Sequence, residues 1–194
     1  MCRLYGTRDR GLSLIPFPDK KYNIIYADPP WSYGAWSDKS SGNGLAAKHY
    51  KTMTNQDICE LKVEDLAEKD CVLFMWVTYP HLQTGLDVIK AWGFTFKTVA
   101  FTWVKRHKNN EYCKGLGYWT RSNAEICLLA VKGSPNKFVI DRSVSQIIDT
   151  VREKHSKKPD VVRERIVQLL GDLPRIELFA RQTAEGWDSW GDEV

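Results

Sequence analysis

The sequence predicts an α/β protein built on a mostly parallel, doubly wound sheet. Short continuous apolar runs recur along the chain, as in strands that are covered on both faces. Helical patterns with recognisable start and stop signals lie between these runs. Several runs are followed at once by charged or aromatic residues, and ligands of open α/β sheets bind just outside the carboxyl ends of strands. We therefore expect the functional site at that edge of the sheet.

The first strand is expected at residues 22–27, where aromatic and β-branched residues dominate. It is followed by Asp28, Pro29, Pro30 and Trp31. Tandem prolines have a fixed φ and restrict the residue before them, so they hold this turn stiff. An isolated Asp-Pro-Pro is more often a plain strand-ending turn, but the tryptophan and the segment after it favour a site.

This turn suits reaction at a planar, weakly nucleophilic amino group, such as the exocyclic amino group of adenine. Two acceptors placed on the two N–H bonds can draw such a nitrogen towards tetrahedral geometry. The carboxylate of Asp28 can supply one acceptor and the backbone carbonyl of Pro29 the other. Trp31 offers a flat face on which an extruded base can stack.

The elements after this turn alternate between helix and strand. A helix is expected after Thr54, which with Asp57 resembles a capping box. The apolar run 71–77 predicts a second strand that is buried on both faces. Pro80 opens a second helix with an apolar stripe, and Gly93 is expected to end it.

The second half of the chain continues the alternation. Residues 96–104 and 126–131 predict two strands, connected through a turn at 115–125 that carries polar groups. Residues 156–160 open a third helix with a clear apolar stripe. Residues 175–181 predict the last strand, and a polar and aromatic tail follows it.

Three segments carry no predicted element. The N-terminal arm 1–21 is broken by prolines. The polar segment 32–50 is expected to be a lid, since long polar loops inside compact domains are usually functional, although a mobile surface loop would look the same. The basic cluster 105–108 is equally compatible with a solvated loop and with phosphate contacts from Lys105, Arg106, Lys108 and Arg121.

The composition is that of one globular domain spanning residues 1–194, with 43% hydrophobic and 27% charged residues. The net charge of +4 permits a polyanionic partner without demanding one. Five cysteines without a C-x-x-C pair fit a reducing cytoplasm, and the four histidines have no metal-ligand spacing. No apolar run is long enough to cross a membrane. We therefore expect neither a metal nor a membrane partner.

The chain lacks the glycine-rich phosphate loops of nucleotide-binding proteins. A nucleoside ligand without phosphates needs no such loop, and S-adenosylmethionine is a ligand of this kind. Its carboxylate requires a cation, and its ribose hydroxyls require polar groups near a strand end. Lys158, Arg181 and the pair Asp192-Glu193 could provide these groups.

Taken together, these motifs resemble those of the MT-A70 family of adenine-N6 methyltransferases. The family includes the catalytic subunit of the eukaryotic mRNA methylation complex, and this chain is similar to its short prokaryotic or viral form over residues 22–194. The segments that carry the resemblance, in order, are Asp28–Trp31, His49-Tyr50, Trp76–Thr78, Trp92–Phe94, Trp103–Lys105, Gly115–Glu125, His155–Pro159, Ile176–Arg181, Gly186-Trp187 and Gly191–Glu193.

The resemblance implies a Rossmann-like class I methyltransferase fold with a permuted motif order, in which the catalytic strand comes first and the cofactor-binding strand last. It implies methyl transfer from S-adenosylmethionine to N6 of adenine in nucleic acid, with DNA favoured over RNA. The implied catalytic residues are Asp28, Pro29, Pro30 and Trp31. The implied cofactor-binding residues are Asp28, Lys158, Phe179, Arg181, Asp192 and Glu193. The implied substrate-binding residues are Trp31, Tyr33, Tyr50, Lys105, Arg121, Asn123 and Glu125.

Other functions fit parts of the pattern. The chain could methylate RNA, or it could be a non-catalytic nucleic-acid-binding partner subunit, although such subunits tend to lose the segment Asp28–Trp31, which is intact here. A third alternative is a small-molecule amine methyltransferase, which would favour an enclosed apolar pocket. We expect a cytoplasmic protein of a bacterium or a virus-infected host cell, acting alone, as a homodimer or with a partner subunit.

Overall fold

The computed structural model describes residues 15–32, 52–117, 119–153 and 157–194. Its strands are β1 (Tyr22–Ala27), β2 (Ala67–Val77), β3 (Thr95–Arg106), β4 (Ala124–Lys132), β5 (Ile147–Val151), β6 (Arg175–Leu178) and β7 (Asp188–Trp190). Its α-helices are α1 (Asn55–Glu60), α2 (Leu82–Ala91) and α3 (Val161–Leu170). Short 3₁₀ turns cover Val63–Asp65, Tyr79–His81 and Pro135–Phe138.

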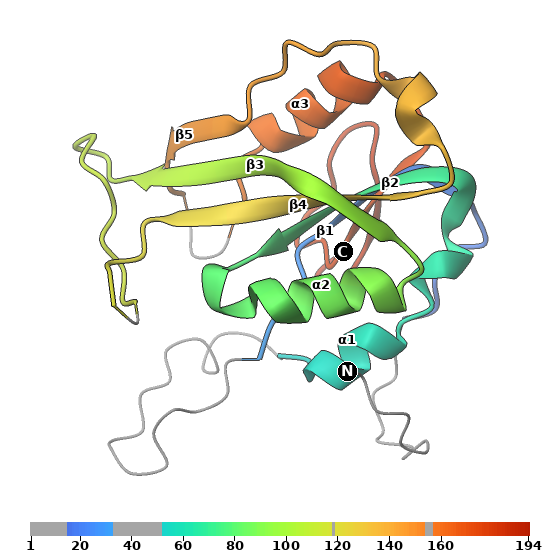
Figure 1. The fold of residues 1–194 in the computed structure, drawn as a ribbon, viewed down its shortest axis with the longest axis horizontal. Helices are drawn as coiled ribbons and strands as arrows, with labels where there is room; N and C mark the ends of the chain where they lie inside the picture. The colour runs from blue at the N-terminus through green and yellow to red at the C-terminus, as the bar shows by residue number, and fades with distance from the viewer. Residues whose placement is uncertain (1–14, 33–51, 118, 154–156) are drawn as a thin grey trace.

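The seven strands form a sheet in the order β5-β3-β4-β2-β1-β6-β7 (Figure 1). All neighbouring strands pair in parallel except β4, which runs antiparallel to both β2 and β3. Six strands therefore end at one edge of the sheet, while β4 begins there. The mostly parallel α/β fold expected from the sequence is confirmed, and it is consistent with a Rossmann-like methyltransferase fold.

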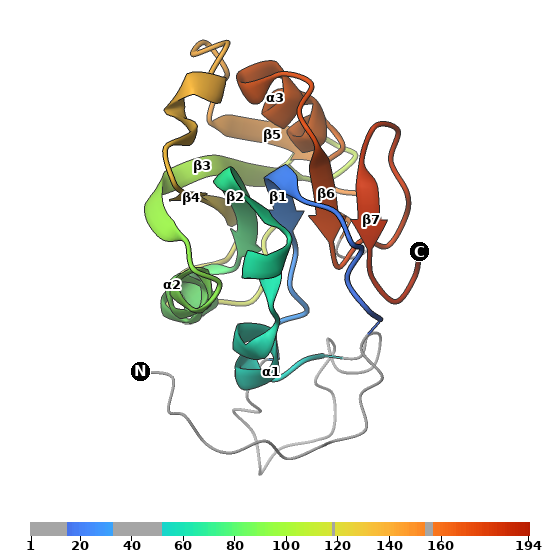
Figure 2. The same cartoon turned by 90° about the vertical axis from the view of Figure 1, so that its right-hand side faces the viewer.

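Helices cover both faces of the sheet. Helix α3 lies on one face, and α1 and α2 lie on the other (Figures 1 and 2). Successive side chains of a strand point to opposite faces, so Ile24 and Tyr26 pack with α3 while Ile25 and Ala27 pack with α1 and α2. Burial on both faces explains why the central strands read as continuous apolar runs.

Strand β1 lies where the direction of winding changes. The chain passes from β1 to β2 through α1, and from β5 to β6 through α3 on the opposite face. Such a switch leaves a crevice outside the carboxyl ends of the two adjacent strands, where ligands of doubly wound sheets bind. Here those strands are β1 and β6, and Asp28 is the first residue after β1.

Local sequence patterns predict the positions of most helices and strands correctly. Thr54 and Asp57 form the expected capping box, in which each side chain accepts a hydrogen bond from the other residue's backbone N–H. Strand β1 has the predicted bounds. Strand β2 begins earlier than predicted, at Ala67, which pairs with Tyr22, and β3 extends from Thr95, which pairs with Val131, to Arg106, which pairs with Val151. The described end of the N-terminal arm packs on β7, where Phe17 contacts the Trp190 ring and the Ile15 carbonyl accepts a hydrogen bond from its indole N–H.

The sequence prediction is wrong at both edges of the sheet, where it assigns no strand to β5 or β7. Each has a single strand neighbour, and β5 is largely exposed, so neither shows a continuous apolar run. The prediction for the last long strand is also wrong at its end. Strand β6 stops at Leu178 rather than Arg181, because Phe179 has a φ of 61° and cannot continue an extended backbone.

No helix in the described ranges is both long enough and apolar enough to span a lipid bilayer.

Gly85 lets α2 pack closely on β2, and this contact generates a stability prediction. A Cβ atom at position 85 would lie 2.5 Å from Cγ1 of Val77. Gly85→Ala should therefore destabilise the protein by about 1–2 kcal/mol, because overpacking costs more than the gain in helix propensity returns. Urea denaturation measures the change, with the exposed Lys90→Ala in the same helix as control. A Gly85→Ala protein as stable as the wild type would contradict this packing.

Candidate active site

Asp28 lies at the carboxyl end of β1, at the centre of the sheet edge where six strands end. Its Oδ2 accepts a hydrogen bond from Nζ of Lys158 at 2.8 Å. Within the part of the chain that the structure describes, its Oδ1 accepts none. The Asp28 side chain is 21% exposed, and among the described residues only one of its carboxylate oxygens is engaged.

Lys158 and Asp28 belong to a row of four alternating charges. Nζ of Lys158 also lies 3.2 Å from Oε2 of Glu125, and Lys105 forms an ion pair with Oε1 of the same carboxylate. The Lys158 and Glu125 side chains are only 12% and 16% exposed. With both acids ionised the four groups have no net charge, which makes their burial tolerable. Glu125 reaches this row because β4, alone among the strands, begins at this edge.

Burial and pairing set the charges of these groups. Burial raises the pKa of the Asp28 carboxyl, and the attraction and hydrogen bond of Lys158 offset this rise only in part. Burial alone would lower the pKa of Lys158, but Asp28 and Glu125 raise it above its ordinary value, so the ammonium stays charged. Burial would also raise the pKa of Glu125, but Lys158 and Lys105 together lower it below its ordinary value. Asp28 is thus the acid of the row whose pKa lies above its ordinary value, because burial outweighs its pairing with Lys158.

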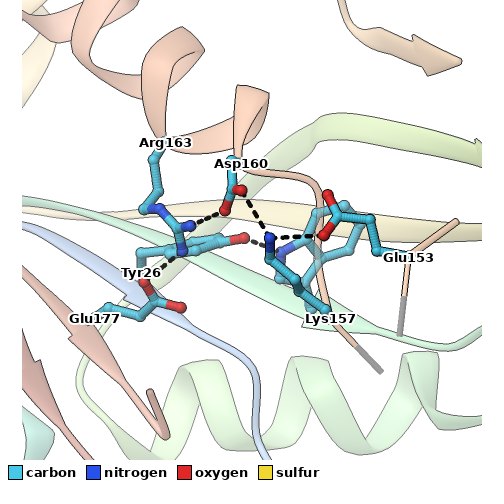
Figure 3. A network of polar contacts seen from close by, with 7 residues as sticks. Tyr26, Glu153, Lys157, Asp160, Arg163 and Glu177 are labelled. Carbon is cyan, nitrogen blue, oxygen red and sulfur yellow. Dashed lines mark hydrogen bonds and ion pairs between the residues drawn. The ribbon is translucent and has the colours of Figure 1, made fainter. Parts of the chain in front are cut away.

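A second polar network fixes the segment that carries Lys158 (Figure 3). Arg163 on α3 donates a hydrogen bond to Glu177 on β6 at 2.8 Å and forms an ion pair with Asp160. Lys157 contacts Glu153 and Asp160, each at 2.8 Å. These contacts tie the start of α3 to the sheet, so Lys158 enters the site from an anchored backbone.

Trp31 is mostly buried and is held from two directions. Its indole N–H donates a hydrogen bond to the Trp76 carbonyl at 3.1 Å, and its ring stacks on His81 with centroids 5.8 Å apart. His81 in turn contacts Thr78 through Nδ1 and the Ser32 carbonyl through Nε2. Only 7% of Trp31 is exposed, so it braces the turn after β1, and a base could meet only its uncovered part.

The Pro29 carbonyl is expected to be the second acceptor for an amino group. It already accepts a hydrogen bond from the Trp31 backbone N–H at 2.9 Å. A carbonyl oxygen has two lone pairs, so one remains. This contact across Pro30 fixes the direction of the carbonyl. The next carbonyl, that of Pro30, accepts from the Met53 N–H at 3.1 Å, which ties the turn to the segment before α1.

The other residues expected to bind a cofactor, apart from Asp28 and Lys158, lie after β6 and β7. Phe179 packs edge-on against Trp190 with ring centroids 5.5 Å apart. Arg181 lies 3.9 Å from the carboxylate of Glu193, and Asp192 next to it is exposed. Gly191 packs so closely that a Cβ would lie 2.8 Å from the Ala180 backbone nitrogen.

The remaining predicted residues are placed differently. Arg121 and Asn123 are exposed on the connection between β3 and β4, and the Asn123 carbonyl accepts a hydrogen bond from the Lys105 N–H at 3.0 Å. Tyr33, Tyr50 and nearly all of the expected lid lie outside the described residues.

Two of the cations expected to contact phosphate are engaged within the protein. Lys105 is paired with Glu125, and Arg106 binds Asp149 on β5 through two hydrogen bonds of 2.5 and 2.6 Å. Contact of these two side chains with phosphate stays a prediction, and it would compete with the ion pairs seen here.

The structure also brings in residues to which the sequence assigned no role. The ammonium of Lys158 lies over the Trp76 ring, 5.6 Å from its centroid, and the Trp76 indole N–H binds the Tyr26 hydroxyl at 2.6 Å. Trp76 lies one residue before the end of β2, the strand next to β1, and this position is the signal that could have marked it. His81, Arg163 and Glu177 carry no comparable signal, because only the fold brings His81 to Trp31 and Arg163 to Glu177.

The MT-A70 family model matches residues 22–193, from the first strand to the last residue but one. The chain belongs to the MT-A70 family. The matched range includes the whole sheet and both sides of the Asp28 site. It thus confirms the resemblance that the motifs suggest.

Individual MT-A70 relatives match nearly the whole chain. It is 37% identical over 191 residues to the type II methyltransferase M.MunI of Mycoplasma sp, which covers 91% of this chain and 79% of that protein. It is 28% identical over 178 residues to the human N(6)-adenosine-methyltransferase catalytic subunit METTL3, covering 90% of this chain and 28% of that protein. A putative N(6)-adenosine-methyltransferase of Medicago truncatula is 29% identical over 90% of this chain and 26% of its own length. The chain therefore spans about a quarter of the length of the plant relative and of the human relative.

The chemistry of this MT-A70 site fits S-adenosylmethionine. A buried, charged Lys158 suits the carboxylate, and Arg181, Asp192 and Glu193 suit a ribose and its base. No group of three or more His, Cys, Asp or Glu side chains that could hold a metal occurs among the described residues.

The row of charges generates a prediction about proton binding. Lys158→Met should raise the pKa of Asp28 further, because burial and the charge of Glu125 remain while the main opposing cation is lost. A carbon-detected NMR titration of the Asp28 carboxyl measures this shift towards higher pH. Lys157→Met is the matched control, since Lys157 pairs with Glu153 and Asp160 instead. Identical Asp28 titrations in the two variants would contradict the proposed coupling.

Proposed function

We propose that this chain transfers a methyl group from S-adenosylmethionine to N6 of adenine in nucleic acid, with DNA as the favoured substrate. The observation that carries the proposal is the position of Asp28 between two sets of groups. Lys105 and Glu125 lie towards β3 and β4, and Phe179 and Arg181 lie beyond β6. A substrate and a cofactor can thus approach the same carboxylate from opposite sides.

The residues of the turn would orient the adenine amino group. Oδ1 of Asp28 and the remaining lone pair of the Pro29 carbonyl would accept its two N–H bonds. The anchored Lys158 keeps Oδ2 of Asp28 in place, so Oδ1 has a defined direction.

Alignment accounts for much of the expected rate. S-adenosylmethionine, when bound, supplies a methyl group on a sulfonium, which is a good leaving group. Holding the amino nitrogen in line with that methyl group then supplies much of the acceleration. The proton lost from nitrogen can pass to Asp28 or to water, and the raised pKa of Asp28 favours its acceptance.

The relatives support the adenine-N6 part of the proposal, since the plant and human matches are named N(6)-adenosine methyltransferases. DNA is favoured because the chain covers most of the Mycoplasma type II methyltransferase M.MunI at 37% identity, and resembles the short prokaryotic form of the family. The intact segment Asp28–Trp31 speaks against a non-catalytic partner subunit.

The proposal is tested by incubating the protein with labelled S-adenosylmethionine and either DNA or RNA, followed by nucleoside mass spectrometry. N6-methyladenine in DNA is the expected product. Methylation confined to RNA would overturn the preference for DNA, and methylation of neither polymer would overturn the proposed function.

Loss of the Asp28 carboxylate should stop transfer without unfolding the protein. Asp28→Ala is expected to lower the methylation rate by about 100-fold or more, since it removes the acceptor that orients the amino group. Circular dichroism checks the fold, and Asp87→Ala on the surface of α2 serves as control. Near wild-type turnover by a folded Asp28→Ala protein would reject this role.

Lys158 should contribute to cofactor affinity. Lys158→Ala is expected to weaken binding of S-adenosylmethionine by about 1.5–3 kcal/mol, the scale of a charge-assisted hydrogen bond. Isothermal calorimetry without nucleic acid gives the affinity directly, and Lys157→Ala is the adjacent control. Unchanged affinity would show that a residue other than Lys158 binds the carboxylate of S-adenosylmethionine.

A further inference from the structure

The connection between β3 and β4 presents apolar side chains to solvent. This hairpin comprises residues 107–117 and 119–123 among those described. At its outer end Trp119 is 100% exposed and Leu116 is 84% exposed. Exposed apolar groups that lie next to each other often mark an interaction surface.

The base of the hairpin is held by contacts with β3 and β5. Arg106 binds Asp149 on β5, donates to the Asn110 carbonyl at 2.8 Å and to the Tyr112 hydroxyl at 3.0 Å, and lies 4.2 Å from the Tyr112 ring centroid. Further out, Gly115 N–H donates to the Ser122 carbonyl at 2.7 Å.

The hairpin is a direct extension of the site. The Lys105 N–H donates to the Asn123 carbonyl at 3.0 Å, and the side chains of Lys105 and Glu125 belong to the row of charges beside Asp28. Trp119 is six residues from Glu125, which places it at most about 20 Å away along an extended chain. That distance spans only a few nucleotides.

The hairpin that carries the exposed Trp119 also carries positive charge. Lys108, Lys114 and Arg121 are exposed and make no ion pair with any described residue, and Glu111 is the single acid in the hairpin. A polyanion with flat bases satisfies both features at once, since cations contact its phosphates and an aromatic ring stacks on a base. An apolar protein surface would leave the three cations without partners.

We propose that this hairpin is a nucleic-acid docking element, in which Trp119 stacks on a base near the target adenine and Lys108, Lys114 and Arg121 contact phosphates. The proposal rests on the proposed function for the identity of its ligand, but it concerns binding rather than transfer. In this proposal the hairpin contributes affinity for nucleic acid, whereas methyl transfer takes place at Asp28 beside the row of charges.

The test measures binding of short fluorescein-labelled DNA of mixed sequence, single-stranded and duplex, by fluorescence anisotropy over a series of salt concentrations. Trp119→Ala should weaken binding of single-stranded DNA by about 5- to 100-fold. The salt slope, which is the slope of log affinity against log salt concentration, should not change. Trp119→Phe should lose less DNA affinity than Trp119→Ala, because it keeps an aromatic ring. Each of Lys108→Gln, Lys114→Gln and Arg121→Gln should reduce the salt slope by about 0.7 on single-stranded DNA.

Matched controls lie at the other end of the same strand. Phe96→Ala and Lys97→Gln change an exposed aromatic and an exposed cation at the start of β3, and both should bind DNA like the wild type. Wild-type affinity of Trp119→Ala for both DNAs would overturn the proposal. A Trp119→Ala protein that binds DNA normally but changes its oligomeric state in sedimentation would also overturn it, and would assign the surface to a protein partner.

Nucleoside mass spectrometry of the wild type separates this inference from the proposed function. If the wild type methylates adenine while Trp119→Ala binds DNA normally, only the docking element fails. If the wild type methylates neither DNA nor RNA but Trp119→Ala loses DNA affinity, the proposed function fails and the docking element stands.

Discussion

The structure depends on placing ionised groups at the edge of a sheet whose interior is apolar. Two carboxylates and two ammonium groups alternate there, and each is tolerated because its neighbours have the opposite charge. The groups come from β1, β3, β4 and the segment before α3, so the arrangement exists only when the sheet and α3 are assembled. The charge balance of the site therefore depends on the assembled fold, and a change in one member of the row alters the electrostatics of the others.

The sequence predicts the parts of this arrangement that are encoded locally. The strand before Asp28, the capping box before α1 and the stripe of α3 are all patterns of neighbouring residues, and the structure confirms them. The motif order also predicts that Asp28 and Lys158, distant in sequence, serve one site. Their 2.8 Å contact agrees with that expectation, although the role of each residue stays a proposal.

What the sequence does not predict depends on tertiary contacts. The short edge strands have too few residues for a pattern, and the direct pairing of Lys105 with Glu125 follows from the antiparallel course of β4. Trp31 illustrates the same limit. Its residue type and position suggest an open surface on which a base can stack, but His81 covers one face of its ring. The residue type fixes what a side chain can do, and the packing fixes which of those options remains.

The antiparallel insertion of β4 has an evolutionary consequence. Because β3 and β4 are adjacent and run in opposite directions, the segment that joins them leaves the sheet and returns without crossing it. That segment can gain or lose residues while the strand order, the buried faces and the Asp28 edge stay the same. Relatives can therefore diversify in what they recognise by exchanging one connection, under separate selection from the residues that would perform the reaction.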